Sequence, residues 1–140
     1  MTGEINGVKC KIKMDYDVPG ERIVDFKTTK DFELQWDGRQ KVPFIEFWRY
    51  DIQAAFYQTI EGNKLPYIIA AVTKEDEPDI EALIIPQARI SQCLDIIEQN
   101  IERFDDIKKG LIEPKRCEKC PYCKNTKVLK EAISYFDKNW

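Results

Sequence analysis

The stretch RIVDFKTTKD, residues 22–31, combines the pattern of a β-strand with two charges that a strand interior rarely contains. Its apolar residues have high strand propensity, so the stretch predicts a partly buried strand. Asp25 and Lys27 are two residues apart and therefore project from one face of that strand, whereas Val24 and Phe26 are expected to face the core. Burying a charge costs free energy unless the group is paired or binds something, so this acid and base need a partner.

The preceding residues predict a second strand that pairs with the first. Residues 8–16 alternate strictly between apolar and polar side chains, as in a strand with one face on a core. Residues 17–20, DVPG, have turn chemistry, so we expect the two strands to form a hairpin. This pairing places Asp15 roughly opposite Asp25 on one face of the sheet.

Two carboxylates in one site favour a bound cation. They repel each other unless one is protonated or a cation lies between them. Mg²⁺ or Mn²⁺ accepts hard oxygen ligands of this kind together with substrate phosphates. Lys27 beside them can orient or activate a water, or neutralise a phosphate. The alternative interpretation is a surface hairpin with alternating charges, in which Lys27 forms an ordinary ion pair with an aspartate.

Composition restricts the class of protein and the available chemistry. The chain has 140 residues, 43% hydrophobic and 34% charged, so we expect one globular domain over residues 1–140. No apolar run is long enough to span a membrane and no signal-peptide pattern is present, which predicts a cytoplasmic protein without a membrane partner. The absence of histidine excludes histidine nucleophile activation and histidine metal ligands. Five cysteines in such a chain do not suggest a disulfide framework.

The rest of the chain predicts an α/β (α+β) domain with the element order β-β-α-β-β-α-α. Apolar residues at helical spacing predict two longer helices, and continuous apolar runs predict two strands that pair across an acidic turn. The predicted elements are strands at 8–16, 22–28, 66–74 and 79–86, helices at 45–61, 87–109 and from about 124, and a loop at 30–44.

The first predicted helix carries polar residues that suit contacts with DNA. Gln53 and Tyr57 are four residues apart and lie on one helix face, and Arg49 lies one turn earlier on the same face. An amide, a phenol and a guanidinium in line suit phosphate and base contacts. The alternative is an ordinary amphipathic helix whose polar face is solvated.

The C-terminal segment, residues 114–140, is basic and rich in cysteine. Eight lysine or arginine residues and two glutamates between Lys108 and Lys130 give that stretch a net charge of +6, whereas the whole chain carries −3. A basic segment beside an acidic body can hold a polyanion near an acidic metal site, and the alternative is a solvated surface. The candidate contacts to DNA phosphates are Lys115, Arg116, Lys119 and Lys124.

The run RCEKCPYC places three cysteines at a spacing that can surround a soft metal. Cys117, Cys120 and Cys123 are each separated by two residues, and thiolates at this spacing can bind Zn²⁺ or an Fe–S cluster. A fourth ligand would come from Cys10, Cys93 or a residue outside this sequence. The alternative is three reduced surface thiols in a loop.

Together, these motifs resemble the PD-(D/E)xK nuclease superfamily. The set runs from Asp15 through the D-x-K tripeptide of the second strand to the pair Gln53-x-x-x-Tyr57 on the following helix. That pair looks like the Q-x-x-x-Y motif of RecB- and RecE-type exonucleases. VDFKTTKD and YDIQAAFYQ are similar to segments of RecE-like, phage-encoded exonucleases. The resemblance covers residues 5–65 by motif and the rest of the chain by element order.

The resemblance implies a fold, an activity and a set of residue roles. The fold would be a restriction-endonuclease-like core, a central mixed β-sheet flanked by helices. The reaction would be metal-assisted hydrolysis of a phosphodiester. The implied roles are binding of Mg²⁺ or Mn²⁺ for Asp15, Asp25 and the backbone carbonyl of Phe26, positioning of the attacking water for Lys27, and contact with the DNA strand for Gln53 and Tyr57.

The implied function is degradation of linear DNA by an exonuclease of phage or prophage recombination, with a single-strand annealing protein and further copies of the chain as partners. Family members usually carry a helix before the first core strand that donates another Glu or His. Here seven residues precede Val8, and Glu4 is too close to the strand to serve, so the chain resembles the C-terminal part of a longer exonuclease or a short form. The alternative functions are a catalytically incomplete nuclease fold that binds DNA or a protein, and a small Zn-stabilised interaction module.

Overall fold

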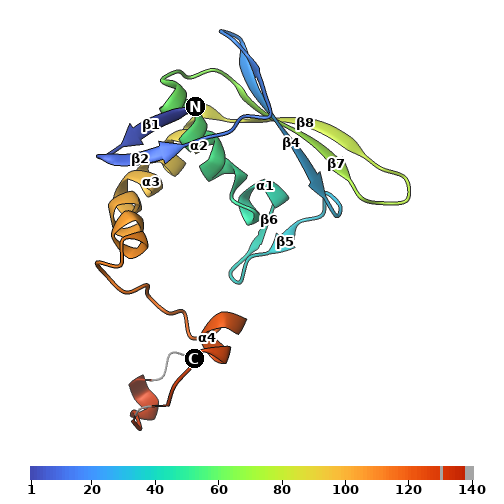
Figure 1. The fold of residues 1–140 in the computed structure, drawn as a ribbon. Coiled ribbons are helices and arrows are strands. Elements are labelled where there is room, and N and C mark those ends of the chain that lie inside the picture. Colours follow the sequence, from blue (N-terminus) through green and yellow to red (C-terminus); the bar gives the residue numbers. More distant parts are fainter. Residues whose placement is uncertain (130, 138–140) are drawn as a thin grey trace. The chain divides into compact units, whose positions relative to one another are not determined.

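The computed structural model describes residues 1–129 and 131–137. The chain forms two compact units, Met1–Asp105 and Asp106–Trp140. All strands of the described residues belong to the first unit, and the second contains the end of the last long helix and two short helical segments (Figure 1). No helix in the described part of the chain is long and apolar enough to cross a membrane.

The first unit is built on a four-stranded mixed sheet. Its strands are β3 (Tyr16–Val18), β4 (Arg22–Thr29), β7 (Tyr67–Thr73) and β8 (Ile80–Ile85), in the order β3-β4-β7-β8. The central strands β4 and β7 are parallel, with Val24 paired to Ile68, and the outer strands are antiparallel to their neighbours. A parallel pair needs a crossover connection, which here contains two helices. The predicted mixed sheet and its central strand are confirmed.

The helices of this unit are α1 (Phe44–Phe47), α2 (Tyr50–Glu61) and the first part of α3 (Gln87–Lys108). The prediction of one helix over 45–61 is wrong, because Arg49 adopts a left-handed backbone conformation with φ of 61°. The last turn of α1 closes with a hydrogen bond from the Trp48 N–H to the Phe44 carbonyl at 3.0 Å. Helical spacing of apolar residues does not reveal a single residue that turns the backbone out of its helical path.

The predicted strand over residues 8–16 is divided in the structure. Its first half, β2 (Val8–Lys11), pairs in antiparallel fashion with an additional strand, β1 (Thr2–Ile5). The two strands are joined by Asn6 and Gly7, both with positive φ. Asn-Gly is the preferred pair for a tight two-residue hairpin turn, so the sequence did contain this signal.

The second half of that predicted strand begins again at Tyr16, after residues 12–15 leave the strand conformation. The predicted loop over 30–44 also contains a small hairpin, formed by β5 (Gln35–Trp36) and β6 (Lys41–Val42). Strands of two residues are too short to produce a recognisable alternation of apolar and polar side chains.

The helices cover the face of the sheet opposite to the one predicted. Ile23 and Asp25 are 0% and 2% exposed, whereas Phe26 is 60% exposed, so the prediction that Val24 and Phe26 face the core is wrong. Hydrophobicity favoured burying Phe26, but the face that packs on the helices is the one that carries the two charges. The core consists of Ile5, Ile23, Phe44, Ala54, Ala55, Tyr67, Ile69, Ala71, Ile85, Ile90, Cys93, Ile97 and Ile101.

The other face of the sheet carries large apolar side chains that remain exposed. Phe26 on β4 and Ile80 and Ile84 on β8 each expose 60% or more of their surface. Ala70 and Ala82 are paired across β7 and β8, and their small side chains leave a hollow of about 600 Å³. The sheet therefore has one packed face and one exposed apolar face.

A buried ion pair joins the start of α2 to α3. Asp51 is 0% exposed, and Arg89 donates to its Oδ2 through Nε at 2.9 Å and through a terminal nitrogen at 2.7 Å. The same terminal nitrogen donates to Oε2 of Glu46 at 3.1 Å. An acid in the first turn of a helix also interacts favourably with the helix dipole. These contacts fix the position of α2, which carries Gln53 and Tyr57.

The variant Arg89→Met should lower the free energy of unfolding by about 3–5 kcal/mol, because it leaves the Asp51 carboxylate buried without its partner. Adding Asp51→Asn should restore part of that loss, since the amide carries no charge. Urea denaturation of the two proteins and the wild type, followed by circular dichroism, measures the difference. A single variant as stable as the wild type would show that the pair does not hold α2 in place.

The second unit contains α4 (Pro121–Asn125) and a 3₁₀ turn, η1 (Tyr135–Asp137). Proline at the first helical position is favourable, because its fixed φ suits a helix and its missing N–H would have no partner there. The prediction of a helix beginning at about residue 124 is therefore wrong in position, since α4 begins at Pro121 and ends at Asn125.

Candidate active site

The buried charges of β4 are paired with each other and with α2. Asp25 forms an ion pair with Lys27 through Oδ2, and its Oδ1 accepts a hydrogen bond from the side-chain amide of Gln53 at 2.8 Å. The Lys27 side chain is 17% exposed. Asp25 and Lys27 therefore lie on one face of β4, as their spacing predicts, and α2 brings Gln53 to them from the next element of the crossover.

A second carboxylate approaches the same place from the segment before β3. The register of the hairpin, with Tyr16 paired to Val24, brings Asp15 level with Asp25. Oδ2 of Asp15 accepts a hydrogen bond from the backbone N–H of Phe26 at 3.0 Å. Asp15 is itself exposed and precedes the strand, so it reaches β4 from the edge of the sheet.

This environment raises the pKa of Asp25. Burial has the largest effect, because it removes the carboxylate from water. Lys27 opposes burial through its hydrogen bond and its charge, the charge of Asp15 adds to the rise, and the hydrogen bond from Gln53 opposes it. Burial, together with the charge of Asp25, also raises the pKa of Tyr67 on the neighbouring strand. Both raised pKa values mean that this part of the sheet favours the neutral forms of Asp25 and Tyr67 unless a positive charge is nearby.

Lys27 is held between the acid and an aromatic ring. Its Nζ lies 4.6 Å from the centroid of the Tyr50 ring, in the arrangement of a cation–π contact. The ammonium group thus has one partner on its own strand and one at the start of α2. Its position is fixed by both elements.

Gln53 and Tyr57 lie on the face of α2 that is turned toward the acids, but they contact different groups. Gln53 donates to Asp25, whereas the Tyr57 hydroxyl donates to the backbone carbonyl of Lys13 at 2.6 Å. The Tyr57 ring packs edge-on against the ring of Tyr67, with centroids 5.8 Å apart. Tyr57 therefore holds the segment that leads to Asp15.

Arg49 belongs to the same surface as these two residues. A hollow of about 450 Å³ is lined by Arg49, Gln53 and Tyr57 together with residues of β2. The Arg49 side chain is 54% exposed, and its Nε lies 4.0 Å from Oδ1 of Asp51. The break between α1 and α2 thus leaves the guanidinium next to the polar face of α2, where the sequence predicts it.

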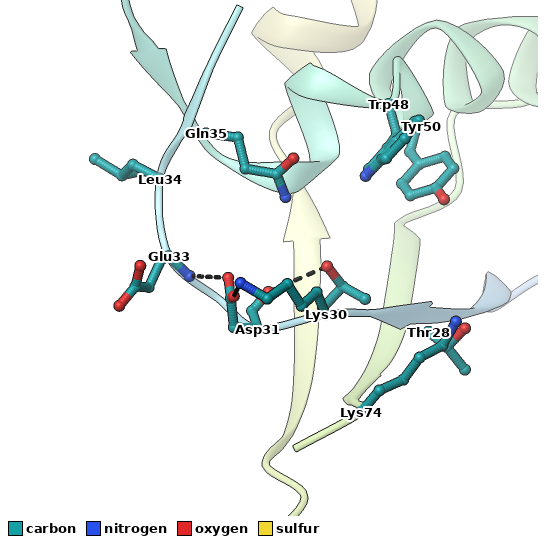
Figure 2. Close-up of a pocket in the computed structure, with 10 residues that line it drawn as sticks. Thr28, Lys30, Asp31, Glu33, Leu34, Gln35, Trp48, Tyr50 and Lys74 are labelled. Atoms are coloured by element: carbon teal, nitrogen blue, oxygen red, sulfur yellow. Dashed lines mark hydrogen bonds and ion pairs between the residues drawn. The ribbon is translucent and has the colours of Figure 1, made fainter.

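A larger cavity of about 670 Å³ lies where β4 and β7 end, and sequence reasoning did not find it (Figure 2). Trp48 and Tyr50 lie on one side of it, the loop after β4 lies on the other, and Lys74 lies at the end of β7. Tyr50 belongs both to this cavity and to the surroundings of Lys27. The sequence signal for this cavity was the pair Trp48 and Tyr50 on either side of Arg49. The expectation of one continuous helix gave no reason to place both aromatic side chains in one cavity.

The three C-terminal cysteines converge within the second unit. All three Sγ atoms lie within 4.8 Å of one another, and those of Cys117 and Cys123 are 3.7 Å apart. The backbone N–H groups of Cys120 and Cys123 point at the sulfur of the preceding cysteine, at 3.3 and 3.4 Å. Hydrogen bonds from the N–H groups of Lys119 and Cys120 lower the pKa of Cys117 to about 6. A thiolate is the form of cysteine that binds metal.

The basic residues around these cysteines differ in their contacts. Arg116 donates to Glu118, to Thr126 and to the carbonyl of Cys123, so its guanidinium stabilises the cysteine loop. Its predicted contact with DNA phosphates would compete with these hydrogen bonds. The exposed lysines of the segment that were predicted to contact DNA are Lys115, Lys119 and Lys124.

The two remaining cysteines lie in the first unit. Cys93 is 0% exposed, and burial together with Asp51 raises its pKa to about 11, which disfavours the thiolate. Cys10 lies on β2, with its Sγ 3.4 Å from the carbonyl of Val8. Of the described residues, only the three C-terminal cysteines group together as potential soft-metal ligands.

The acid pair has the donor set of a divalent cation site. Two carboxylates meet beside β4, and the buried one has a raised pKa partly because of the other. A cation near both would relieve that repulsion. Carboxylate and carbonyl oxygens are the ligands that Mg²⁺ and Mn²⁺ accept.

The mixed sheet, with its D-x-K strand and the helix that follows, is the core of the PD-(D/E)xK nuclease class. A family model described as a PDDEXK-like domain of unknown function (DUF3799) matches residues 1–126. The chain belongs to this family. A comparison with curated proteins gives no match.

A solved structure has the same fold as this chain. It is the crystal structure of a protein from Eubacterium rectale named "putative exonuclease", with a TM-score of 0.83 and 42% sequence identity. The similarity covers 98% of this chain and 54% of the other. The chain therefore spans about half the length of that protein.

The raised pKa of Asp25 predicts a loss of stability of the metal-free protein as pH rises through that pKa. The folded state keeps the proton to higher pH than the unfolded chain, whose carboxyl has a pKa of 3.8, so the stabilising contribution is complete below that value and is lost as pH rises through the raised pKa. Asp25→Asn removes the titrating group. Its stability relative to the wild type should therefore increase as pH rises above about 4.

Urea denaturation across this pH range in the presence of EDTA measures the effect. Asp76→Asn, in the exposed turn between β7 and β8, is the matched control and should show no such trend. A difference between Asp25→Asn and the wild type that is the same at every pH would contradict the raised pKa.

Proposed function

We propose that this chain provides the catalytic centre of a Mg²⁺- or Mn²⁺-dependent exonuclease that hydrolyses linear DNA. The observation that carries the proposal is the convergence of Asp15, Asp25, Lys27 and Gln53 at one point of the sheet. Family membership and the name of the Eubacterium rectale protein support the same class of reaction. The similarity of the motifs to RecE-like proteins favours a role in phage or prophage recombination, with a single-strand annealing protein as partner.

The metal ligands in this proposal are Asp15, Asp25 and the backbone carbonyl of Phe26. Asp25 is held in place by Gln53, and Asp15 by the N–H of Phe26, so both carboxylates have restricted positions. When bound, the ion supplies positive charge that stabilises the oxygens of the reacting phosphodiester. The ion would also compensate the charges that raise the pKa of Asp25.

The other residues position reactants and ligands. Lys27 orients the attacking water, because its ammonium is fixed beside Asp25 and over the Tyr50 ring. Gln53 orients the Asp25 carboxylate, and Tyr57 holds the backbone that leads to Asp15. Arg49 is exposed in the adjacent hollow and contacts a phosphate of the DNA strand.

The decisive experiment is cleavage of end-labelled linear duplex DNA with Mg²⁺ or Mn²⁺, with circular duplex as the substrate that an exonuclease leaves intact. Asp25→Asn should reduce the rate by more than about 100-fold, since even residues behind metal ligands contribute 10–100-fold. Lys27→Ala should lower kcat by about 10²–10⁴-fold while leaving DNA affinity nearly unchanged. Asp76→Asn should cleave like the wild type.

An Asp25→Asn protein that cleaves normally would rule out this centre. If the wild type binds DNA but cleaves neither substrate with either ion, the second candidate function applies: a nuclease fold without catalysis that binds DNA or a protein. The observation that favours this alternative is the position of Glu4, which lies on β1 opposite Lys9, in a sheet separate from the one that carries Asp25.

We further infer that Cys117, Cys120 and Cys123 bind one soft metal ion, with Zn²⁺ favoured over an Fe–S cluster. Four sulfurs around one Zn²⁺ at about 2.3 Å lie about 3.8 Å apart, close to the 3.7 Å between Cys117 and Cys123. In a cluster with four irons each thiolate binds its own iron, which places the sulfurs farther apart. The hydrogen bonds from backbone N–H groups to sulfur also stabilise thiolates in a single-ion site.

Metal analysis of the purified chain should give about one zinc per chain, and Cys120→Ser should lose it because one of the three ligands is removed. Cys93→Ala is the matched control and should keep the zinc, since Cys93 is buried in the core of the first unit. Iron with acid-labile sulfide in place of zinc would contradict the single-ion site. Equal zinc content in Cys120→Ser and the wild type would contradict any site at these cysteines.

A further inference from the structure

The cavity at the ends of β4 and β7 has the size and walls of a ligand site. Its volume of about 670 Å³ lies within the range of about 300–1,000 Å³ that small-molecule sites occupy. Trp48, between the two helices of the crossover, exposes 57% of its surface and lies on one side of the cavity together with Tyr50 (Figure 2). A large aromatic side chain exposed at the rim of a cavity is suited to stacking on a flat ligand.

The opposite wall is held in one conformation by a set of hydrogen bonds. The N–H of Lys74 donates to the carbonyl of Thr29 at 2.9 Å, which joins the ends of the two strands. The Thr29 hydroxyl donates to the carbonyl of Asp31 at 3.1 Å. The Asp31 carboxylate accepts from the N–H of Glu33 at 3.0 Å (Figure 2). The wall is thus formed before any ligand arrives, which lowers the entropy cost of binding.

The charges around the cavity balance one another. The lysines Lys30 and Lys74 are matched by Asp31 and Glu33, and Lys30 pairs with Asp31 at 3.2 Å. A cavity without net charge does not select a phosphate. It suits an uncharged aromatic ligand with polar edges, for which Glu33 and Gln35 supply hydrogen-bonding groups.

The cavity is joined to the acid centre through one residue. Tyr50 lines the cavity, and its ring also receives the ammonium of Lys27, which pairs with Asp25. A ligand that contacts Tyr50 in the cavity is therefore separated from the Lys27–Asp25 pair by the Tyr50 ring. The strand β4 connects the two places directly, since Asp25 and Lys27 precede Thr28 and Thr29 on it.

We propose that this cavity binds one unstacked nucleobase of the DNA strand whose phosphodiester lies at Asp25, with Trp48 stacked on the base. The proposal rests on the proposed function for the identity of the ligand as DNA. An exonuclease acts at a strand end, where bases unpair most readily, and a base removed from the helix needs a surface on which to stack. Base stacking on aromatic side chains is tolerant of sequence, because every base has a flat face. Trp48 is accordingly a positioning residue for the terminal nucleotide.

A protein with Trp48 as its single tryptophan, made by Trp36→Phe and Trp140→Phe, tests the proposal directly. A short single-stranded oligonucleotide, added in EDTA so that no cleavage occurs, should quench the Trp48 emission, because a stacked base is in direct contact with the indole ring. Blunt duplex of the same length should quench it less, because its bases remain stacked in the helix. Unchanged emission at saturating oligonucleotide would overturn the proposal.

Affinity for the oligonucleotide provides the second measurement. Trp48→Ala should weaken binding by about 5- to 100-fold, the range expected for the loss of one stacked base. Trp36→Ala is the matched control, because Trp36 is 63% exposed and does not line the cavity. If the two variants bind DNA equally well, the cavity does not hold a base. Circular dichroism of both variants confirms that any loss of binding does not come from unfolding.

Failure of this proposal and failure of the nuclease assignment give different results. If Asp25→Asn abolishes cleavage while Trp48→Ala leaves affinity and KM unchanged, the nuclease assignment holds and the base pocket is wrong. If Trp48 emission responds to the oligonucleotide but no divalent cation supports cleavage, the pocket holds and the nuclease assignment is wrong.

Discussion

The ion pair between Asp25 and Lys27, on the packed face of β4, is the constraint that the surrounding elements of the first unit have to satisfy. Both charges lie on the packed face of β4, where hydrophobic side chains would ordinarily be favoured. A buried pair of this kind is weak evidence for stability, because the loss of hydration opposes the attraction between the charges. Its presence on this face agrees with the proposed chemistry, which needs a carboxylate and an ammonium side by side. The surrounding elements then serve to keep that pair in one geometry.

The geometry of the Asp25–Lys27 pair depends on contacts with α2, and the position of α2 depends on contacts with α3. Gln53 fixes one oxygen of Asp25, and the Tyr50 ring fixes the ammonium of Lys27, so both depend on the position of α2. That position is set in turn by the pair of Asp51 with Arg89 on α3. A centre whose residues come from a strand and a helix thus depends on contacts well away from it.

The sequence predicted the residues of the centre better than it predicted the direction in which they face. The D-x-K spacing and the i, i+4 pair of Gln53 and Tyr57 are local properties. The structure brings Lys27 and Gln53 to Asp25, whereas Tyr57 donates to the backbone carbonyl of Lys13. The orientation of β4 was predicted wrongly because Phe26 is more hydrophobic than Asp25, and only the packing of α2 decides which face is covered. The break at Arg49 depends on one backbone torsion, which no periodic pattern reports. The cavity beside Trp48 was missed for the same reason.

The parallel pairing of β4 with β7 has a consequence for how the chain folds. The two strands are separated by residues 30–66, so the central pair of the sheet closes a long loop, and folds with such distant pairings form slowly. During synthesis, β4 leaves the ribosome about 2–8 seconds before β7, at about 5–20 residues per second. In that interval the edge of β4 that later pairs with β7 is unpaired, and strands of other chains could pair with it and form an aggregate. Inward-pointing charges are a known protection against such association. The charges of Asp25 and Lys27 therefore disfavour association of the nascent strand with other chains before α2 packs against β4.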